Sequence, residues 1–295
     1  MTQTSNRRSG GRAARHALRN APLAEDVRPV RGGMAGGRLK ALSDAEVLRI
    51  HKAALTVLDE IGLADAPQSG IDIMVKAGAR LGEDGRLRFA PALVEDMLAK
   101  AARDMTVFGR DPKYDMMMTG TNVHYGTAGA AVNMVEPDGR SYRHSTLQDL
   151  HDAARIADRL DNIHFLQRPM VARDLPDNLE LDLNTLYACC TGTTKHVGTS
   201  ITEPANAAAC LDLAYAIAGG EDNFRARPFV SNSNCFVVPP LKFATESCEV
   251  MEACIRGGMP VLLLSAGMAG ATAPATLAGA IVQAVAECLA GIVYV

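Results

Sequence analysis

Five short apolar runs recur along the second half of the chain at a nearly constant interval. They begin at Ile163, His196, Pro228, Pro260 and Gly291, so successive starts lie 33, 32, 32 and 31 residues apart. Most are rich in Val, Ile, Leu or Phe and are bounded by Gly, Pro or Asn, which is typical of buried strands. About 31 residues is the length of one strand–helix unit in a β/α barrel of roughly 250 residues.

Amphipathic helices are predicted between the runs. In segment 242–257 the apolar residues Phe243, Val250, Met251 and Cys254 share one helical face, and segment 274–290 repeats the same offsets. No residue pattern recurs from unit to unit, which argues against a solenoid. We therefore expect an α/β fold, a (β/α)8 barrel of the TIM type that is truncated after about four to five units.

Three regions are predicted along the chain. Residues 1–40 form a flexible basic arm, in which nine Lys and Arg residues face only Glu25 and Asp26. This arm is either a solvated tail or a segment that wraps an acidic surface or a second subunit. Residues 41–140 form a helical and irregular subdomain, and residues 141–295 form the first, incomplete part of the barrel. Because such a sheet would have an open edge, we expect residues 1–295 alone to aggregate or remain partly unfolded.

Local signals place elements within the 41–140 subdomain. A capping box, Ser43 with Glu46, begins a helix whose apolar stripe ends at Gly62. A second helix is predicted over about 91–102, and a hairpin turn is predicted at Pro137–Gly139.

Composition excludes several classes of function. The formal net charge is −3, which does not favour nucleic acid as a partner. No signal-peptide hydrophobic region follows Met1, and we expect no membrane span and a cytoplasmic location. The seven cysteines lack Cys-x-x-Cys spacing, so we interpret them as small buried residues rather than metal ligands.

Polar residues stand where the predicted strands end. In β/α barrels the ligand lies at the C-terminal ends of the strands, so these residues are candidates for substrate binding, although some of them cap the following helix instead. The predicted substrate-binding residues are Gln167, Arg168, Thr199, Asn232, Asn234, Ser265 and Gly267. Segment 265–270 is also predicted to open a helix whose free N–H groups bind an anion, unless its glycines serve only close packing. His196 begins a strand and is interpreted as structural, and His124 is a weaker candidate for the site.

Four segments resemble one known family, the trimethylamine:corrinoid methyltransferases, which includes glycine betaine methyltransferases without pyrrolysine. The segments occur in the family order and cover the chain from about Arg7 to Val295. They are the helix from Leu42 to Gly62, Ser145-Thr-Leu-Gln-Asp-Leu-His, Thr193-Thr-Lys-His196 and Gly270-Ala-Thr-Ala-Pro-Ala-Thr-Leu.

The resemblance implies an enzyme that moves a methyl group from a tertiary or quaternary methylamine to the corrinoid (cobalamin) of a separate corrinoid protein. It implies no covalently bound cofactor, and we expect the full-length protein to be a homo-oligomer. The chain has no Trp and only 4% aromatic residues, so an aromatic cage for the ammonium group must come partly from outside these residues or be made otherwise. This composition favours a betaine-like substrate and a member without pyrrolysine. Two alternatives stay open: a zinc-dependent thiol or folate methyltransferase, and a non-catalytic paralogue that binds an amine or a corrinoid protein.

Overall fold

The computed structural model describes residues 11, 16–17, 21, 32–37 and 39–295. The chain divides into two compact units, Met1–Arg31 and Gly32–Val295. Most of the predicted basic arm therefore lies outside the described residues. The parallel sheet and the helices around it belong to the second unit.

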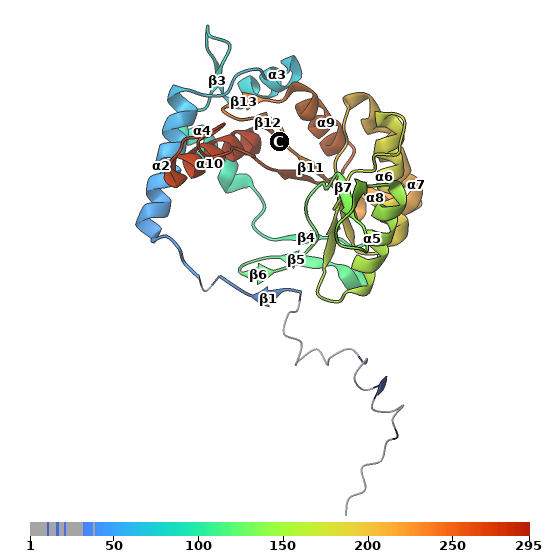
Figure 1. The fold of residues 1–295 in the computed structure, drawn as a ribbon. Helices are drawn as coiled ribbons and strands as arrows, with labels where there is room; N and C mark the ends of the chain where they lie inside the picture. The colour runs from blue at the N-terminus through green and yellow to red at the C-terminus, as the bar shows by residue number, and fades with distance from the viewer. Residues whose placement is uncertain (1–10, 12–15, 18–20, 22–31, 38) are drawn as a thin grey trace, which may run out of the picture. The chain divides into compact units, whose positions relative to one another are not determined.

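Four parallel strands form the central sheet. They are β9 (Phe165–Gln167), β10 (His196–Thr199), β11 (Val230–Asn234) and β14 (Val261–Leu263), which lie side by side in chain order (Figure 1). The first four apolar runs are confirmed as strands. The described chain is thus a mixed α/β fold with a parallel sheet.

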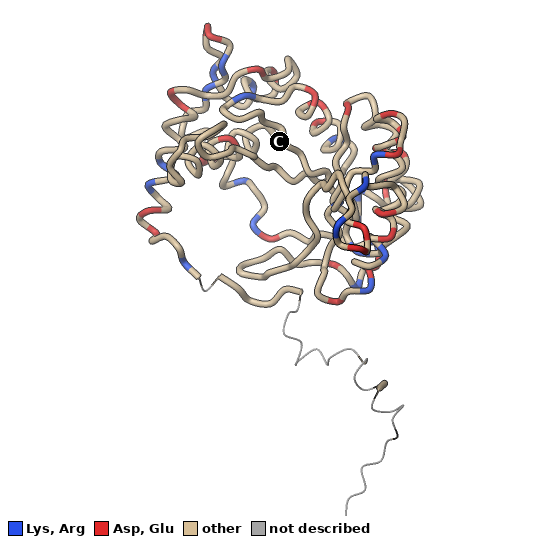
Figure 2. Tube along the Cα trace, viewed as in Figure 1, with Lys and Arg blue, Asp and Glu red and all other residues tan. Residues whose placement is uncertain are grey.

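Helices cover one face of this sheet. They are α5 (Leu147–Arg159), α6 (Asn178–Gly192), α7 (Ala207–Ala218), α8 (Glu221–Ala226) and α9 (Thr245–Arg256). Leu166, Val197 and Val230, one from each of three neighbouring strands, join a core cluster with the buried faces of the helices. The four strands of the parallel sheet carry no Lys, Arg, Asp or Glu, and the charged residues lie on the surrounding helices, loops and short antiparallel strands (Figure 2). We call the face opposite these helices the inner face; Gln167, His196, Gly198, Ser231, Ser233 and Leu262 lie on it.

The prediction of a fifth strand at Gly291 is wrong. Helix α10 runs from Leu277 to Tyr294, straight through that run. Gly291 resembles a helix stop in the sequence, but it is a contact point: a Cβ there would lie 2.6 Å from Cζ of Phe236 and 3.0 Å from Cδ1 of Leu263. Glycine is therefore required by close packing within the helix rather than by its termination.

The helix predicted over 242–257 is shorter than expected. Lys242–Phe243 forms strand β13, which pairs in antiparallel fashion with β12 (Val237–Val238), and α9 begins only at Thr245. Phe243 thus lies on a strand, where it packs against Phe236 and Tyr294. Its position in a helical pattern with Val250 is a coincidence of spacing.

A second core lies beneath the N-terminal helices. Helix α2 (Asp44–Glu60) has the predicted capping box, in which Ser43 and Glu46 bond each other's backbone N–H. Helix α4 (Pro91–Lys100) confirms the second predicted helix, whereas α3 (Gln68–Ala77), after Pro67, was not predicted. All three contact α10, so the last helix completes a core built by the first ones.

Short antiparallel pairs make up the rest of the fold. The hairpin around Pro137–Gly139 is confirmed, since its turn joins β7 and β8. The pairs are β1 (Met34–Ala35) with β6 (Asn122–Val123), β2 (Arg80–Leu81) with β3 (Leu87–Arg88), β4 (Met105–Val107) with β5 (Met116–Met118), and β7 (Asn133–Val135) with β8 (Tyr142–His144). Two 3-10 turns, Pro112–Tyr114 and Pro204–Asn206, complete the elements.

Among the described residues, α10 is the one helix that is long and apolar enough to cross a membrane by length and composition. Core helices pass the same test. Because α10 buries Gln283 and Glu287 and packs on three other helices, we interpret it as a core helix.

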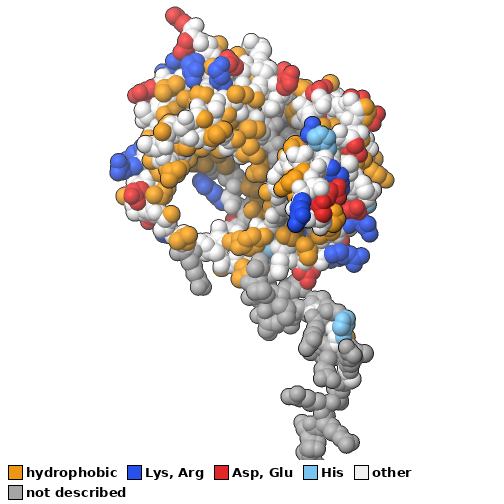
Figure 3. All heavy atoms as spheres, viewed as in Figure 1, with side chains coloured by type: hydrophobic (Ala, Val, Ile, Leu, Met, Phe, Trp, Pro, Cys, Tyr) orange, Lys and Arg blue, Asp and Glu red, His pale blue; other side chains and the backbone are white. Residues whose placement is uncertain are grey.

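The two edges of the sheet differ. Segment 126–131 runs parallel to the chain at β9, with bridges from Gly126 to Phe165 and from Ala131 to Met170. At the other edge, β14 pairs with β11 only, and Leu262 on its inner face is 54% exposed. Figure 3 shows an opening in the molecule with hydrophobic side chains along much of its rim.

Candidate functional site

The C-terminal ends of the parallel strands bring polar side chains together on the inner face. The Oγ of Ser233 on β11 donates to Oε1 of Gln167 on β9, at 3.0 Å across the intervening strand. This contact passes directly over Gly198, where a Cβ would lie 1.9 Å from Oε1 of Gln167. Glycine on β10 thus makes room for the Gln167 side chain, whose amide N–H groups remain available to a ligand.

Strand β11 divides its polar residues between the two faces. Val230, Asn232 and Asn234 are buried and alternate with the half-buried Ser231 and Ser233. The Oδ1 of Asn232 accepts from the backbone N–H of Ile201 at 3.1 Å, and Nδ2 of Asn234 donates to the carbonyl of Ser247 at 2.9 Å.

The two predicted asparagines therefore do share a face, as their spacing indicates, but it is the face covered by helices. The inner face carries the serines between them. The alternation in the sequence separates the asparagines from the serines, yet it does not specify which pair lies on the inner face. The Oδ1 of Asn234 is buried and has no hydrogen-bond partner among the described residues.

Arg168 follows β9 directly. Its backbone N–H bonds the carbonyl of Gly198 at 2.9 Å, but its guanidinium has no hydrogen bond or ion pair with any described residue. Burial lowers the pKa of Arg168, while the nearby Cys189 and Asp182 act in the opposite direction. Asp182 is already bound by Thr202 and Asn206 and is not its partner. A half-buried guanidinium with free donors is a candidate anion site.

Thr199 ends β10, and Ser200 follows it. Thr199 is buried, with 2% of its surface exposed, and its backbone lies opposite Asn232. Ser200 donates from Oγ to the carbonyl of Ser233 at 3.2 Å. The structure thus brings the ends of β10 and β11 together through these residues.

Segment 265–270 does not open a helix, contrary to expectation. The next helix, α10, begins at Leu277, where Thr276 caps it. The backbone N–H groups of residues 270–273 bond carbonyls of Met268 and Ala273 in a local turn, so they are not free for an anion. Gly267 packs close to Ala273 and Gln283.

Ser265 leads to a residue that sequence reasoning missed. Its Oγ donates a short hydrogen bond to Oε2 of Glu287, a carboxylate with 0% exposure. The other oxygen of Glu287 accepts from Leu241 N–H at 2.9 Å and from Nε2 of Gln283 at 3.1 Å. A glutamate within an otherwise apolar helix was the available signal.

His196 lies at the opposite, N-terminal end of the sheet. His196 is buried at the start of β10, with Nδ1 2.8 Å from the carbonyl of Phe108 and Nε2 2.9 Å from Oγ of Ser231. Burial lowers the pKa of His196 to about 4. The neutral ring ties three segments together, which supports its structural interpretation.

His124 lies beside His164, before β9. The ring of His124 meets that of His164 edge-on, with centroids 5.8 Å apart. His164 accepts at Nδ1 from the backbone N–H of Tyr125 at 2.7 Å. Both rings therefore hold the segment before β9 rather than the strand ends.

The cysteines are free thiols, and five of the seven are buried. Burial raises the pKa of Cys189, Cys190, Cys210, Cys248 and Cys254 to about 12. Cys235, just after β11, is exposed. Within the described ranges there is no group of three His, Cys, Asp or Glu residues suited to a metal ion.

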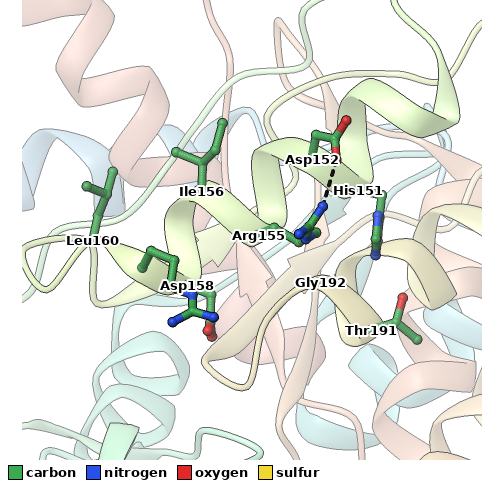
Figure 4. Close-up of a pocket in the computed structure, with 9 residues that line it drawn as sticks. His151, Asp152, Arg155, Ile156, Asp158, Leu160, Thr191 and Gly192 are labelled. Carbon is green, nitrogen blue, oxygen red and sulfur yellow. Dashed lines mark hydrogen bonds and ion pairs between the residues drawn. The ribbon is translucent and has the colours of Figure 1, made fainter.

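A hollow of about 850 Å³ lies elsewhere, on the outside of α5 and α6. Its lining includes Arg155, Asp158, Leu160 and Gly192, and Arg155 pairs with Asp152 across part of it (Figure 4). These helix ends lead into the N-terminal ends of β9 and β10. The hollow is therefore remote from the strand ends that hold the polar cluster.

Comparison with known proteins identifies the family of this chain. The family model described as "Trimethylamine methyltransferase (MTTB)" matches residues 8–295. The chain belongs to the trimethylamine methyltransferase family. The resemblance carried by the four sequence segments is thereby confirmed.

Curated relatives of this methyltransferase family include proteins named for different substrates. Trimethylamine methyltransferase MttB of Desulfitobacterium hafniense (strain DCB-2) is 33% identical over 90% of this chain and 54% of its own length. MttB1 of Methanosarcina mazei is 30% identical over 87% of this chain and 53% of its own. Glycine betaine methyltransferase of D. hafniense (strain Y51) is 29% identical over 85% and 52%. The chain spans about half the length of the curated relatives it matches.

Proposed function

We propose that the chain is part of an enzyme that transfers a methyl group from a tertiary or quaternary methylamine to the corrinoid of a separate corrinoid protein. Family membership over residues 8–295 is the observation that carries this proposal. The polar residues at the ends of β9, β10, β11 and β14 support it, because parallel α/β folds bind ligands at that end of the sheet.

The proposed reaction is a displacement at carbon. A corrinoid protein would supply the nucleophile that takes the methyl group, and the carbon–nitrogen bond of the substrate would break with its electron pair going to the amine. The protein aligns the methyl group with cobalt and excludes water. Gln167, held by Ser233, is suited to orienting the amine substrate.

The architecture that we propose for the whole protein is a (β/α)8 barrel. The four parallel strands in chain order with outer helices fit its first units. We also retain a cytoplasmic location and a homo-oligomeric state as proposals.

Arg168 favours a substrate with a carboxylate. Trimethylamine has no group that would bind a guanidinium, whereas a betaine-like substrate pairs its carboxylate with Arg168 in a charge-assisted, bidentate contact. The free donors of Arg168 support a trimethylammonium carboxylate as the methyl donor.

The test follows formation of methylated corrinoid by absorbance, with cob(I)alamin or a purified corrinoid protein and the enzyme expressed from its full reading frame. We expect transfer from a betaine, and Arg168→Gln should lower its kcat/KM about 100-fold by removing a charged hydrogen-bonded pair. Arg159→Gln, a charge change on the outer side of α5, is the matched control.

Each outcome of this assay has a separate meaning. Absence of methyl transfer from every methylated amine overturns the enzyme proposal and favours the non-catalytic paralogue. Transfer from a betaine that is unaffected by Arg168→Gln overturns the carboxylate assignment alone. The zinc-dependent alternative is not favoured by any cluster of donors among the described residues.

A further inference from the structure

Glu287 is a buried carboxylate without a positive partner among the described residues. Its three contacts are the Leu241 N–H, the Gln283 amide and the Ser265 hydroxyl, and none of these carries a charge. An ionised carboxylate removed from water is costly unless charge or strong hydrogen bonds offset the loss of hydration. The three hydrogen bonds that Glu287 accepts replace this hydration, and its carboxyl group lies behind the C-terminal end of β14 with no opposite charge beside it among the described residues.

Ser265 is the link between this charge and the accessible strand end. Ser265 is half-buried, and its hydroxyl proton is committed to Glu287. Its oxygen lone pairs are therefore left as acceptors on the other side. Because its proton is bonded to the carboxylate, the Ser265 oxygen presents a negative potential and cannot donate a hydrogen bond to a ligand.

The field of Glu287 is felt at the neighbouring strand end as well. Cys235 follows β11 and is exposed; burial, and then the charge of Glu287, raise the pKa of its thiol. Gly267 lies beside Gln283, so backbone also lines this corner closely. The ends of β11 and β14 thus share one region of negative potential.

Among the described residues that follow β11 and β14, in segments 235–243 and 264–276, no aromatic side chain is exposed. Phe236, the aromatic residue nearest the end of β11 in sequence, is fully buried and packs against Gly291. A quaternary ammonium held without an aromatic cage needs a negative potential instead.

We propose that Glu287, acting through Ser265, is the positioning residue that holds the methylated ammonium group of the substrate at the end of β14. This inference rests on the proposed function, since it assigns the ammonium part of the same site. The charge attracts the cation, and the serine oxygen makes the contact with its N-methyl groups. Glu287 itself does not touch the substrate.

The informative variant is Glu287→Gln. A glutamine has the same shape, its oxygen accepts from Leu241 and Gln283, and its amide N–H donates to Ser265. All three contacts therefore survive, the charge is lost, and the Ser265 hydroxyl, now an acceptor from residue 287, regains a free proton. The matched control is Glu252→Gln on α9, where the carboxylate accepts from Ser69 at 2.8 Å and Tyr294 at 2.7 Å. This control also removes one carboxylate charge, but at a position remote from the C-terminal ends of β11 and β14.

The probes are choline and its neutral isostere 3,3-dimethylbutan-1-ol, with affinity measured by calorimetry on the protein from its full reading frame. Neither carries a carboxylate, so the result is independent of Arg168. We expect the unmodified protein to prefer choline by about 30-fold, the order set by one charge near a partly screened site. Glu287→Gln should reduce this preference to below about 3-fold, and Glu252→Gln should leave it unchanged.

Several results would overturn the inference. They are equal affinity for the two probes, no binding of either, or a choline preference that survives Glu287→Gln. If Glu287→Gln also lowers the melting temperature, Glu287→Asp decides, because it keeps the charge and should keep the preference. A choline preference without methyl transfer to corrinoid would retain this site and overturn the proposed enzyme, so the two failures are distinguishable.

Discussion

The ammonium nitrogen of Lys195 lies 2.6 Å from the carbonyl oxygen of Ile163, at the N-terminal end of the parallel sheet. The same nitrogen donates to the carbonyls of Ala157 at 2.7 Å, in the last turn of α5, and Leu160 at 2.8 Å, directly after that helix. Only 1% of Lys195 is exposed. One buried cation thus closes the C-terminus of α5 and fixes the turn into β9.

Replacing Lys195 by Met should destabilise the fold strongly. The change removes three hydrogen bonds donated by a buried ammonium. The Ala157 and Leu160 carbonyls keep their backbone donors, the N–H groups of Leu160 and Ile163, whereas the Ile163 carbonyl loses the Lys195 donor. We expect the free energy of unfolding to fall by about 3 kcal/mol. Urea denaturation measures it. Lys113→Met, at a lysine whose side chain is 62% exposed, is the control and should stay within about 0.5 kcal/mol. A loss below about 1 kcal/mol for Lys195→Met would show that the carbonyls find other partners.

The buried ring of His196 predicts a specific pH dependence. Its pKa is lowered from 6.5 to about 4 in the folded protein, so between these values the unfolded chain binds more protons than the folded one. Stability is therefore fully present above about pH 6.5 and falls towards pH 4, by up to about 3 kcal/mol from this group.

The measurement is the urea unfolding free energy at several pH values for the protein and for His196→Asn. Subtracting the two removes the titration of all other groups. The difference should shrink as pH falls from 6.5 to 4; a difference independent of pH would mean that His196 does not titrate on unfolding in this window.

Gly198→Ala should displace Gln167. The new methyl group would occupy the position of the Gln167 amide oxygen, which breaks its bond with Ser233 and costs about 1 kcal/mol of stability. In a Gln167→Ala background the same substitution should cost almost nothing. A double-mutant cycle measures this coupling, and equal costs in both backgrounds would place the clash elsewhere.

Gly291→Ala tests whether close packing against Phe236 requires glycine at this position of α10. Alanine is the better helix former by about 1 kcal/mol, yet its methyl group would collide with the buried ring of Phe236. We expect a net loss of about 2 kcal/mol in thermal or urea unfolding. The loss should become smaller in a Phe236→Leu background; stabilisation by Gly291→Ala alone would show that helix propensity dominates.

Local patterns in the sequence were sufficient for much of this fold. The spacing of the apolar runs predicted five parallel strands, of which four are confirmed, because each strand and helix unit has a nearly fixed length. The Ser43 and Glu46 pair predicted the start of α2 for a similar reason, since a capping box is made by residues three apart. The candidate residues at strand ends were found in the same way, and their role in substrate binding stays a prediction.

Tertiary contacts decided the remainder. Gly291 indicates a helix end by itself and proves to be a packing point only because Phe236, 55 residues earlier, lies against it. Asn232 and Ser233 have different surroundings because helices cover one side of the sheet, and alternation alone does not specify which of the two faces the helices. Glu287 gains its partners from Leu241, Ser265 and Gln283, so its burial is invisible in α10 alone. The sequence by itself determines local structure, such as a helix cap formed by residues three apart. Burial and charge at a site depend on segments that only the folded chain brings together.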